Sequence, residues 1–390
     1  MKILLVRTFP DVLNVSNYNS QELGLARAFA KLGHKCDIVY YCGDEPDHDE
    51  SFPSEGEPVV IHWLHGRAVF KNAIFPSLDA LLPQYDIIQT NGYDQYTSWK
   101  LYTGKNPNVT LYHGTYLSDF NRKYKMRTAI FDALFMIRHK DRVRRTPCFT
   151  KSGLAEQFLR TKGFTDVTAV GVGFDAERLE RGGEESEWVK KLRDEKGDRR
   201  YLLYIGHIDE LRDTLFLLRA AARAMIADER IELVIVGKGE EEYTKKCREL
   251  AESLGISSKI HYQPSLPQSQ LKALYEASDA FLLPSRHEIF GMVLLEAMYF
   301  EVPAITTYNG GSQMMIRDGE NGFIIGSRTE EDEKKWAERA LEIAAGKYPE
   351  MGRAASRTVR ENYMWLPIAR RMLERYQRML DEKGVKERGV

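Results

Sequence analysis

Short apolar runs alternate with amphipathic stretches along most of the chain. The first run, Lys2–Val6, precedes a stretch in which Leu23, Ala26 and Phe29 recur at the spacing of one helix face. Apolar strands that alternate with helices predict a parallel sheet covered on both faces. In the first half of the sequence we expect strands at Lys2–Val6, Cys36–Tyr41, Val59–Trp63, Asp86–Thr90 and Val109–His113.

A second series of the same kind follows a charge-dense stretch. The first series ends near Gly171–Asp175, and residues 176–200 then hold few apolar positions, as a surface linker or an exposed helix pair would. The two series predict two doubly wound α/β domains that face each other, with the ligand crevice at the carboxyl ends of both sheets. We expect domains at 1–175 and 176–365 and a C-terminal helix at 366–390, whose packing on the first domain stays open. The later strands are expected at Tyr201–Gly206, Glu232–Gly237, Lys259–Gln263, Ala280–Pro284 and Pro303–Thr307.

Composition and charge narrow the class of protein. The chain has 390 residues, which suits two domains better than one core, and 43% of them are hydrophobic. The net charge of -1 gives no overall field for nucleic acid, so an electrostatic role requires a local patch. The four cysteines form no CxxC pair, and no apolar run approaches about 18 residues, so we expect a cytoplasmic protein with reduced thiols.

The segment Arg286–Met298 places two glutamates around a nearly pure apolar run. A buried carboxylate is costly unless it is paired, so Glu288 and Glu296 need an explanation. The segment follows an expected strand and continues in a helical pattern, which puts Gly291 at the strand-to-helix turn. The first amides of such a helix can hold a phosphate, and Glu296 lies about 7.5 Å further along the axis, within reach of ribose hydroxyls. A buried helix with one exposed glutamate is the alternative.

Longer motifs surround this segment. PSRHEIFGMVLLEAM and VPAITTYNGGSQMMIRDGENGF follow ELVIVGKGEEE and the run from Ile256 to Ser285, while LARAFAKLGH and GVGFD stand in the first half. Together they resemble the E-x7-E signature and its flanking blocks in the retaining GT-B glycosyltransferases of family 4, also called glycosyl transferases group 1. The resemblance covers most of the second domain and is weaker in the first. It implies two Rossmann-like domains and sugar transfer from a nucleotide-diphosphate sugar, with no bound metal and no other cofactor.

The resemblance also implies roles for individual residues. Glu296 matches the glutamate that binds the donor's ribose, and Glu288 matches the one beside the donor sugar and the diphosphate. His113, at the end of an expected strand, matches a histidine near the transferred sugar, so His113 and Glu288 are the catalytic candidates. A strand-end histidine that the backbone satisfies is the alternative for His113. The amides that would cradle the phosphate belong to Phe290, Gly291, Met292 and Val293.

Three features depart from the family's pattern. An arginine and a lysine usually neutralise the diphosphate, whereas this chain has His207 and Arg212 at those positions. A histidine is mostly neutral near pH 7, whereas an arginine is always charged. The positive charge that faces the diphosphate is therefore reduced unless another cation, such as Arg286, supplies it. Met314 stands where the family usually has a glutamate, and the loop after the first strand lacks its paired glycines. We still expect His207 and Arg212 to face the diphosphate, and we favour UDP over GDP.

A local basic patch lies within residues 121–146. This segment holds nine Lys or Arg against Asp132 and Asp141, with the apolar run Ala129–Ile137 between its basic ends. A basic helix with an apolar face suits an anionic membrane surface, and the resemblance favours this because many relatives extend lipid-linked glycans. A helix packed on the core with solvated ends fits the pattern equally well. The protein is therefore expected in the cytoplasm, with peripheral attachment to the inner face of the membrane left open.

An acidic loop contains Asp47-His48-Asp49, which fits the D-x-D pattern that binds a divalent ion in GT-A enzymes. We expect a solvated charge run there and no metal.

The leading hypothesis is a retaining hexosyltransferase that acts on a glycan or a lipid-linked sugar in polysaccharide biosynthesis. His207 and Met314 keep open a non-catalytic nucleotide-sugar-binding protein. Another GT-B enzyme, such as a sugar phosphorylase or a nucleotide-sugar epimerase, also stays open.

Overall fold

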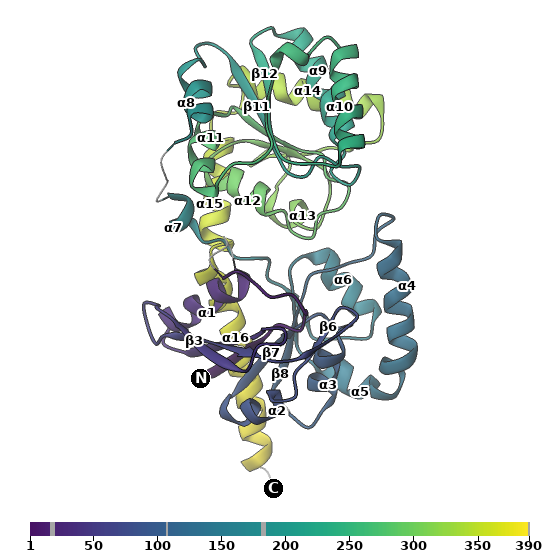
Figure 1. Ribbon diagram of the computed structural model, residues 1–390, viewed down its shortest axis with the longest axis vertical. Coiled ribbons are helices and arrows are strands. Elements are labelled where there is room, and N and C mark those ends of the chain that lie inside the picture. The colour runs from purple at the N-terminus through teal and green to yellow at the C-terminus, as the bar shows by residue number, and fades with distance from the viewer. Residues whose placement is uncertain (16–19, 107, 181–184, 389–390) are drawn as a thin grey trace. The chain divides into compact units, whose positions relative to one another are not determined.

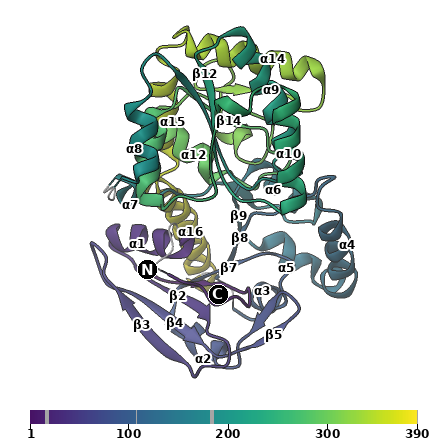
Figure 2. The same cartoon turned by 45° about the horizontal axis from the view of Figure 1, so that its top comes forward.

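The chain forms two compact units (Figure 1 and Figure 2). One consists of Met1–Phe174 together with Met364–Val390, and the other of Asp175–Tyr363. The computed structural model describes residues 1–15, 20–106, 108–180 and 185–388.

The first unit is built on a parallel sheet with one antiparallel edge strand. Within the described residues its strands are β1 (Lys2–Val6), β2 (Lys35–Tyr41), β3 (His48–Phe52), β4 (Val59–Leu64), β7 (Ile87–Asn91), β8 (Val109–His113), β9 (Cys148–Thr150) and β10 (Val167–Ala169). Their order is β10-β9-β8-β7-β1-β2-β4-β3, and only β3 runs antiparallel to its neighbour. Leu4 and Leu5 point to opposite faces of β1 and both are buried, so both faces of the sheet are covered. A separate hairpin pairs β5 (Arg67–Val69) with β6 (Asn72–Ile74).

Helices of the first unit cover this sheet. The C-terminal helix is one of them, because Tyr376 donates a hydrogen bond from its hydroxyl to Gln89 Oε1 at 2.5 Å and its ring lies 5.8 Å from that of Phe29. Gly24 lies against Trp365, where an added Cβ would fall 2.2 Å from the indole nitrogen. The last helix therefore belongs to the first unit although it follows the second in sequence. The helices are α1 (Gln21–Lys31), α2 (Leu78–Leu81), α3 (Tyr96–Thr103), α4 (Arg122–Phe131), α5 (Lys140–Arg145), α6 (Gly153–Thr161) and α16 (Trp365–Arg388).

The second unit has a parallel sheet of the Rossmann type. Its strands in the described ranges are β11 (Arg200–Ile205), β12 (Ile231–Val236), β13 (Ile260–Gln263), β14 (Ala280–Leu283), β15 (Ala304–Thr306) and β16 (Phe323–Ile324). They are ordered β13-β12-β11-β14-β15-β16, which is the 3-2-1-4-5-6 order of a doubly wound sheet. The order reverses between β11 and β14, and ligands of such sheets bind at the carboxyl ends of the strands on either side of this reversal.

The helices of the second unit pack on both sides of its sheet. Phe216 and Trp336 meet edge to face at 5.5 Å, and Arg219 donates to Glu333 at 2.5 Å beside them. The charge-dense stretch that the sequence suggested as a linker or a helix pair forms two short helices. The helices are α7 (Ala176–Glu180), α8 (Glu187–Asp194), α9 (Thr214–Ala227), α10 (Glu241–Ser253), α11 (Leu271–Ala277), α12 (Met292–Tyr299), α13 (Ser312–Met315), α14 (Glu330–Ala344) and α15 (Met351–Asn362).

Candidate functional site

The candidate site begins at the turn between β14 and α12. Gly291 is the N-cap of α12 and has a φ of 82°, a left-handed conformation that side chains with a Cβ rarely adopt. A Cβ at this position would also lie 3.2 Å from Glu288 Cγ. The first amides of a helix have no partner within the helix and lie at its positive dipole end, where anions bind. The four residues predicted to cradle a phosphate, Phe290, Gly291, Met292 and Val293, all lie at this turn.

Glu296 lies inside the second unit on α12. It is only 3% exposed, and its Oε2 accepts a hydrogen bond of 2.9 Å from the hydroxyl of Tyr275 on α11. Tyr275 is itself fully buried, so its hydroxyl has a fixed position and holds the carboxylate in one orientation. This contact explains how a glutamate is tolerated in an apolar helix. No sequence pattern indicated Tyr275, because the two residues meet only through the packing of α11 on α12.

Glu288 and Arg212 form an ion pair across two loops. The Arg212 guanidinium donates to Glu288 Oε2, and the same nitrogen lies 3.3 Å from Ser285 Oγ and 3.5 Å from the His287 carbonyl oxygen. Burial raises the pKa of the Glu288 carboxyl above its usual range, although Arg212 acts in the opposite direction. The loops after β11 and β14 therefore bring together a cation and a carboxylate that lie far apart in sequence.

Arg286, the cation proposed as a substitute for the missing arginine, is paired as well. Its Nε donates to Asp213 Oδ2 at 2.6 Å. Asp213 is buried at the start of α9 and has a φ of 53°. Part of the Arg286 charge is thus compensated by a carboxylate that sequence reasoning missed.

A glycine pair closes the site from the side of β15. The Gly310 amide donates to the Glu288 carbonyl at 3.0 Å, and a Cβ on Gly310 would lie 2.2 Å from the Ile289 carbonyl oxygen. A Cβ on Gly311 would lie 1.5 Å from the Phe290 carbonyl oxygen. Only glycine permits this approach of two backbones. Met314, one turn further, accepts a hydrogen bond of 2.8 Å from Tyr363 through its backbone carbonyl.

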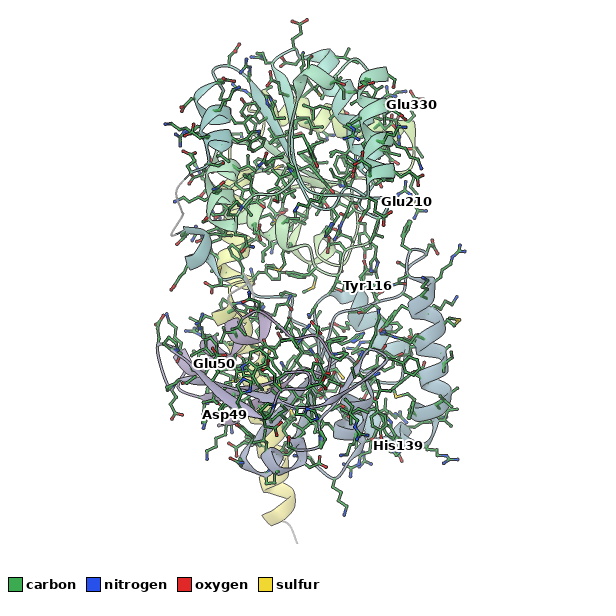
Figure 3. All side chains as sticks on the ribbon, viewed as in Figure 1. Asp49, Glu50, Tyr116, His139, Glu210 and Glu330 are labelled. Atoms are coloured by element: carbon green, nitrogen blue, oxygen red, sulfur yellow. The ribbon has the colours of Figure 1, made fainter. Side chains whose placement is uncertain are left out.

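His207 lies on the exposed surface of the loop after β11. Its backbone carbonyl accepts a hydrogen bond of 2.5 Å from the Tyr204 hydroxyl. The residue lines a pocket of 630 Å³ together with Lys238, Tyr243 and Glu210, the last of which is labelled in Figure 3. Lys238 is a cation that sequence reasoning missed, although its place in VGKGE could have indicated it. His207 and Arg212 thus lie on one loop, and His207 lines the pocket.

His113 belongs to the first unit, where β8 ends. It is 2% exposed, lies 5.5 Å from the Tyr93 ring edge to face and stacks on Phe158 at 5.8 Å. Its Nε2 has no hydrogen-bond partner among the described residues. Burial lowers the pKa of His113 to about 4, so the imidazole is neutral at pH 7.

The acidic loop of the first unit makes local contacts. Asp47 Oδ1 accepts from the His65 amide at 2.6 Å, and Asp49 Oδ1 lies 2.7 Å from His62 Nδ1. In the part of the chain that the structure describes, no three His, Cys, Asp or Glu side chains are placed to hold a metal ion. The expectation that the chain needs no metal stays a prediction.

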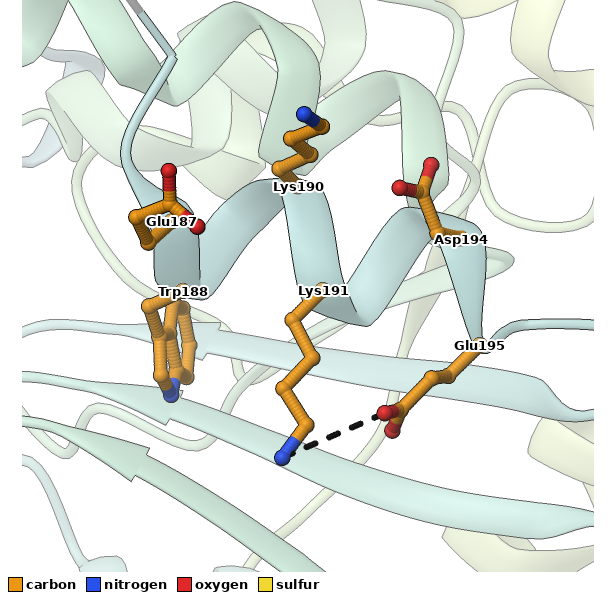
Figure 4. A pocket seen from close by; sticks show the side chains of 6 residues that line it. All are labelled: Glu187, Trp188, Lys190, Lys191, Asp194 and Glu195. Carbon is orange, nitrogen blue, oxygen red and sulfur yellow. Dashed lines mark ion pairs between the residues drawn. The ribbon is translucent and has the colours of Figure 1, made fainter.

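A second hollow lies along α8 in the second unit (Figure 4). Its lining comes from α8 and the adjoining Glu195, which lies 3.9 Å from Lys191 one turn earlier. None of the predicted site residues lies there, so we assign it no role.

Comparison with known proteins extends these observations. The structure superimposes on HepE from Anabaena in complex with UDP with a TM-score of 0.69 at 15% identity, covering 97% of this chain and 100% of that one. Sucrose-phosphate synthase from Thermosynechococcus elongatus gives a TM-score of 0.68 at 18% identity, covering 98% and 100%. This is the GT-B fold. The expectation of two Rossmann-like domains is confirmed.

The family model matches the second unit of the chain. Residues 186–358 match the family model of glycosyl transferases group 1. D-inositol 3-phosphate glycosyltransferase of Frankia alni is 30% identical over 234 residues, which are 56% of this chain and 54% of that protein. The enzyme of the same name from Rhodococcus erythropolis is 33% identical over 183 residues, covering 45% and 40%. The chain thus aligns with about half the length of these curated relatives.

Proposed function

We propose that the protein is a glycosyltransferase that takes a hexosyl group from a nucleotide-diphosphate sugar. The observation that carries the proposal is the meeting of three groups at the switch point of the second sheet. They are the first amides of α12, the Arg212–Glu288 pair and the Glu296 carboxylate held by Tyr275. An anion-binding helix start next to a carboxylate fits a diphosphate that is joined to a ribose.

The negative charge that develops on the leaving diphosphate explains how these groups would act. Cleavage of the bond between sugar and diphosphate leaves negative charge on the leaving group, and fixed amides and cations stabilise that charge in the transition state. Glu288 and Glu296 have separate partners, Arg212 and Tyr275, which differs from the acid–nucleophile couple of a hydrolase. We propose retention of configuration, by attack on the same face with help from the leaving phosphate, as the resemblance to family 4 implies.

The finer features of the substrates are part of this proposal. UDP is favoured over GDP, and the acceptor is a glycan or a lipid-linked sugar of a polysaccharide pathway. The curated relatives are named for D-inositol 3-phosphate, so a polyol phosphate belongs in the same acceptor screen.

A mass-spectrometric screen of UDP and GDP sugars tests the function. The full chain is incubated with each donor, with and without acceptors, after thermal-shift ranking of the donors. We expect slow donor hydrolysis without acceptor, transfer with the right acceptor, and unchanged turnover in a chelator. Donor binding without hydrolysis or transfer would favour the non-catalytic alternative, which His207 and Met314 support. Turnover that depends on inorganic phosphate would instead indicate a phosphorylase.

A further inference from the structure

The helical segment that begins with α4 presents a row of apolar side chains to solvent. Met126, Ile130, Leu134 and Ile137 are 63%, 55%, 69% and 62% exposed. They recur every three or four residues along α4, the π-helical turn Asp132–Met136 and the 3-10 turn Ile137–His139, and all four belong to the exposed side of the segment. We call these four side chains the outer row. In Figure 1, α4 forms the outer flank of the first unit.

The opposite face of the same segment packs on the core of the first unit. Phe131 and Met136 are buried in its core, while Arg127 donates to Asp94 at 2.5 Å. Asp132 is neutralised by Lys162 at 2.6 Å. One face of the segment therefore packs on the core, as one of the two hypotheses expected, while the other face leaves apolar surface in water. The outer row takes no part in this packing.

Positive charge surrounds the outer row. Within the described residues, none of the exposed cations of the segment has an ion-pair partner, and the exposed acid beside them is Asp141. The cations stand at both ends of the row, before Met126 and after Ile137, where Figure 3 labels the neighbouring His139. They are Arg122, Lys123, Lys125, Arg138, Lys140, Arg142, Arg144 and Arg145.

We propose that the outer row inserts into an anionic lipid surface and that the flanking cations bind its headgroups. Exposed apolar side chains next to Lys and Arg are typical of helices that lie in a membrane interface. Anionic headgroups complement the excess of eight exposed cations over one exposed acid. Within the described ranges, no helix has the length and hydropathy to cross a bilayer, so this contact would be peripheral. The proposal does not depend on the donor site.

Vesicle flotation of the full chain tests the proposal. Vesicles of phosphatidylcholine alone are compared with vesicles that also contain phosphatidylglycerol, at low and at high salt. The test variant combines Ile130→Ser with Leu134→Ser. The matched control is Ile226→Ser, because Ile226 on α9 is 71% exposed outside the segment. A third variant carries Arg142→Gln, Arg144→Gln and Arg145→Gln. Thermal unfolding verifies that each variant is folded, as expected for exposed positions.

Flotation should distinguish the variants. We expect the wild-type chain to float with the anionic vesicles at low salt. The outer-row variant should partition about tenfold less to these vesicles, and Ile226→Ser should partition as the wild type does. The arginine variant loses binding and becomes less sensitive to salt. In the variant Leu134→Trp, the tryptophan emission shifts to the blue when anionic vesicles are added. No flotation of the wild type, or equal flotation of wild type and outer-row variant, would overturn the proposal. So would an outer-row variant that only dissociates an oligomer.

Discussion

The two units share a parallel-sheet plan but differ in the chemistry at the carboxyl ends of their strands. The second unit gathers charged groups that neutralise one another, with Arg212 on Glu288 and Arg286 on Asp213. The first unit buries the neutral His113 among aromatic rings. Paired charges can exchange partners with an anionic ligand, whereas a neutral imidazole offers hydrogen bonds without charge. This difference is the reason we propose anion binding for the second unit, and the following predictions test the proposal.

The largest effect is expected from Glu296→Ala. Two ribose hydroxyls that each donate to a carboxylate contribute about 1.5–3 kcal/mol apiece, so UDP affinity should fall at least about hundredfold. Isothermal titration calorimetry with UDP measures it. The control is Glu330→Ala, since Glu330 is an exposed glutamate on α14 of the same unit. Because Tyr275 loses its contact with Glu296 in the variant, unfolding is followed in parallel without ligand. Unchanged UDP affinity would remove Glu296 from the nucleotide site.

The second prediction concerns the neutral histidine of the first unit. The pKa of His113 is about 4 in the folded chain, against about 6.5 when unfolded. The unfolded state therefore binds the extra proton first, and stability is complete above pH 6.5 and is lost as the pH falls toward 4. By this linkage the free energy of unfolding should drop by about 2 kcal/mol between pH 7 and pH 5. Asp94 acts against this shift, and Lys151 and Arg127 act with it.

Denaturant unfolding at several pH values measures the His113 effect. In His113→Gln the drop between pH 7 and pH 5 should shrink by that amount, whatever the variant's stability at pH 7. His48→Gln is the matched control, since His48 lies on the exposed edge strand β3. If both variants keep the wild-type slope, His113 is not the buried neutral group described here.

The strands of the two units show how much of the fold could be predicted from the sequence. Strands with continuous apolar runs, such as β1 and β11, were predicted to within one residue because burial on both faces demands that pattern. The edge strand β3 was missed, since HDESF is polar and pairs on one side only. β9 and β10 were missed because three-residue strands are too short for periodicity to appear.

The candidate site was predictable in part. The turn at Gly291 follows from a strand, a glycine and a helical pattern in direct succession, and all of these are local. The partners of its charged groups are not local. Tyr275 meets Glu296, and Asp213 meets Arg286, only after separate β/α units have packed together. No sequence spacing encodes such contacts, so the roles of Glu288, Glu296, His113, His207 and Arg212 stay predictions that the experiments address.

A smaller effect is expected from Tyr275→Phe. The variant removes the hydroxyl that orients Glu296 but keeps the ring, so a hydrogen bond worth about 1–1.5 kcal/mol is lost. We expect UDP affinity to fall by about tenfold. Tyr201→Phe is the matched control, since the buried Tyr201 hydroxyl donates to the Leu192 carbonyl at 2.9 Å in the same unit. Equal losses in both variants would mean that general destabilisation, and not carboxylate orientation, determines the affinity.

The smallest effect on UDP affinity is expected at His207, where a single side chain can be made neutral or charged. A guanidinium at this position would always be charged, so if residue 207 faces the diphosphate, His207→Arg should bind UDP more tightly than the wild type. Because His207 is exposed and screened by solvent, we expect a gain of only about threefold to tenfold.

Isothermal titration calorimetry with UDP at pH 8, where the terminal phosphate is ionised, measures the affinities. Lys238→Gln, at another residue that lines the pocket, separates the effect of position 207 from the general field of the pocket. Unchanged affinity in His207→Arg would mean that this side chain does not face the diphosphate, and Arg212 would then be the proposed cation on this loop.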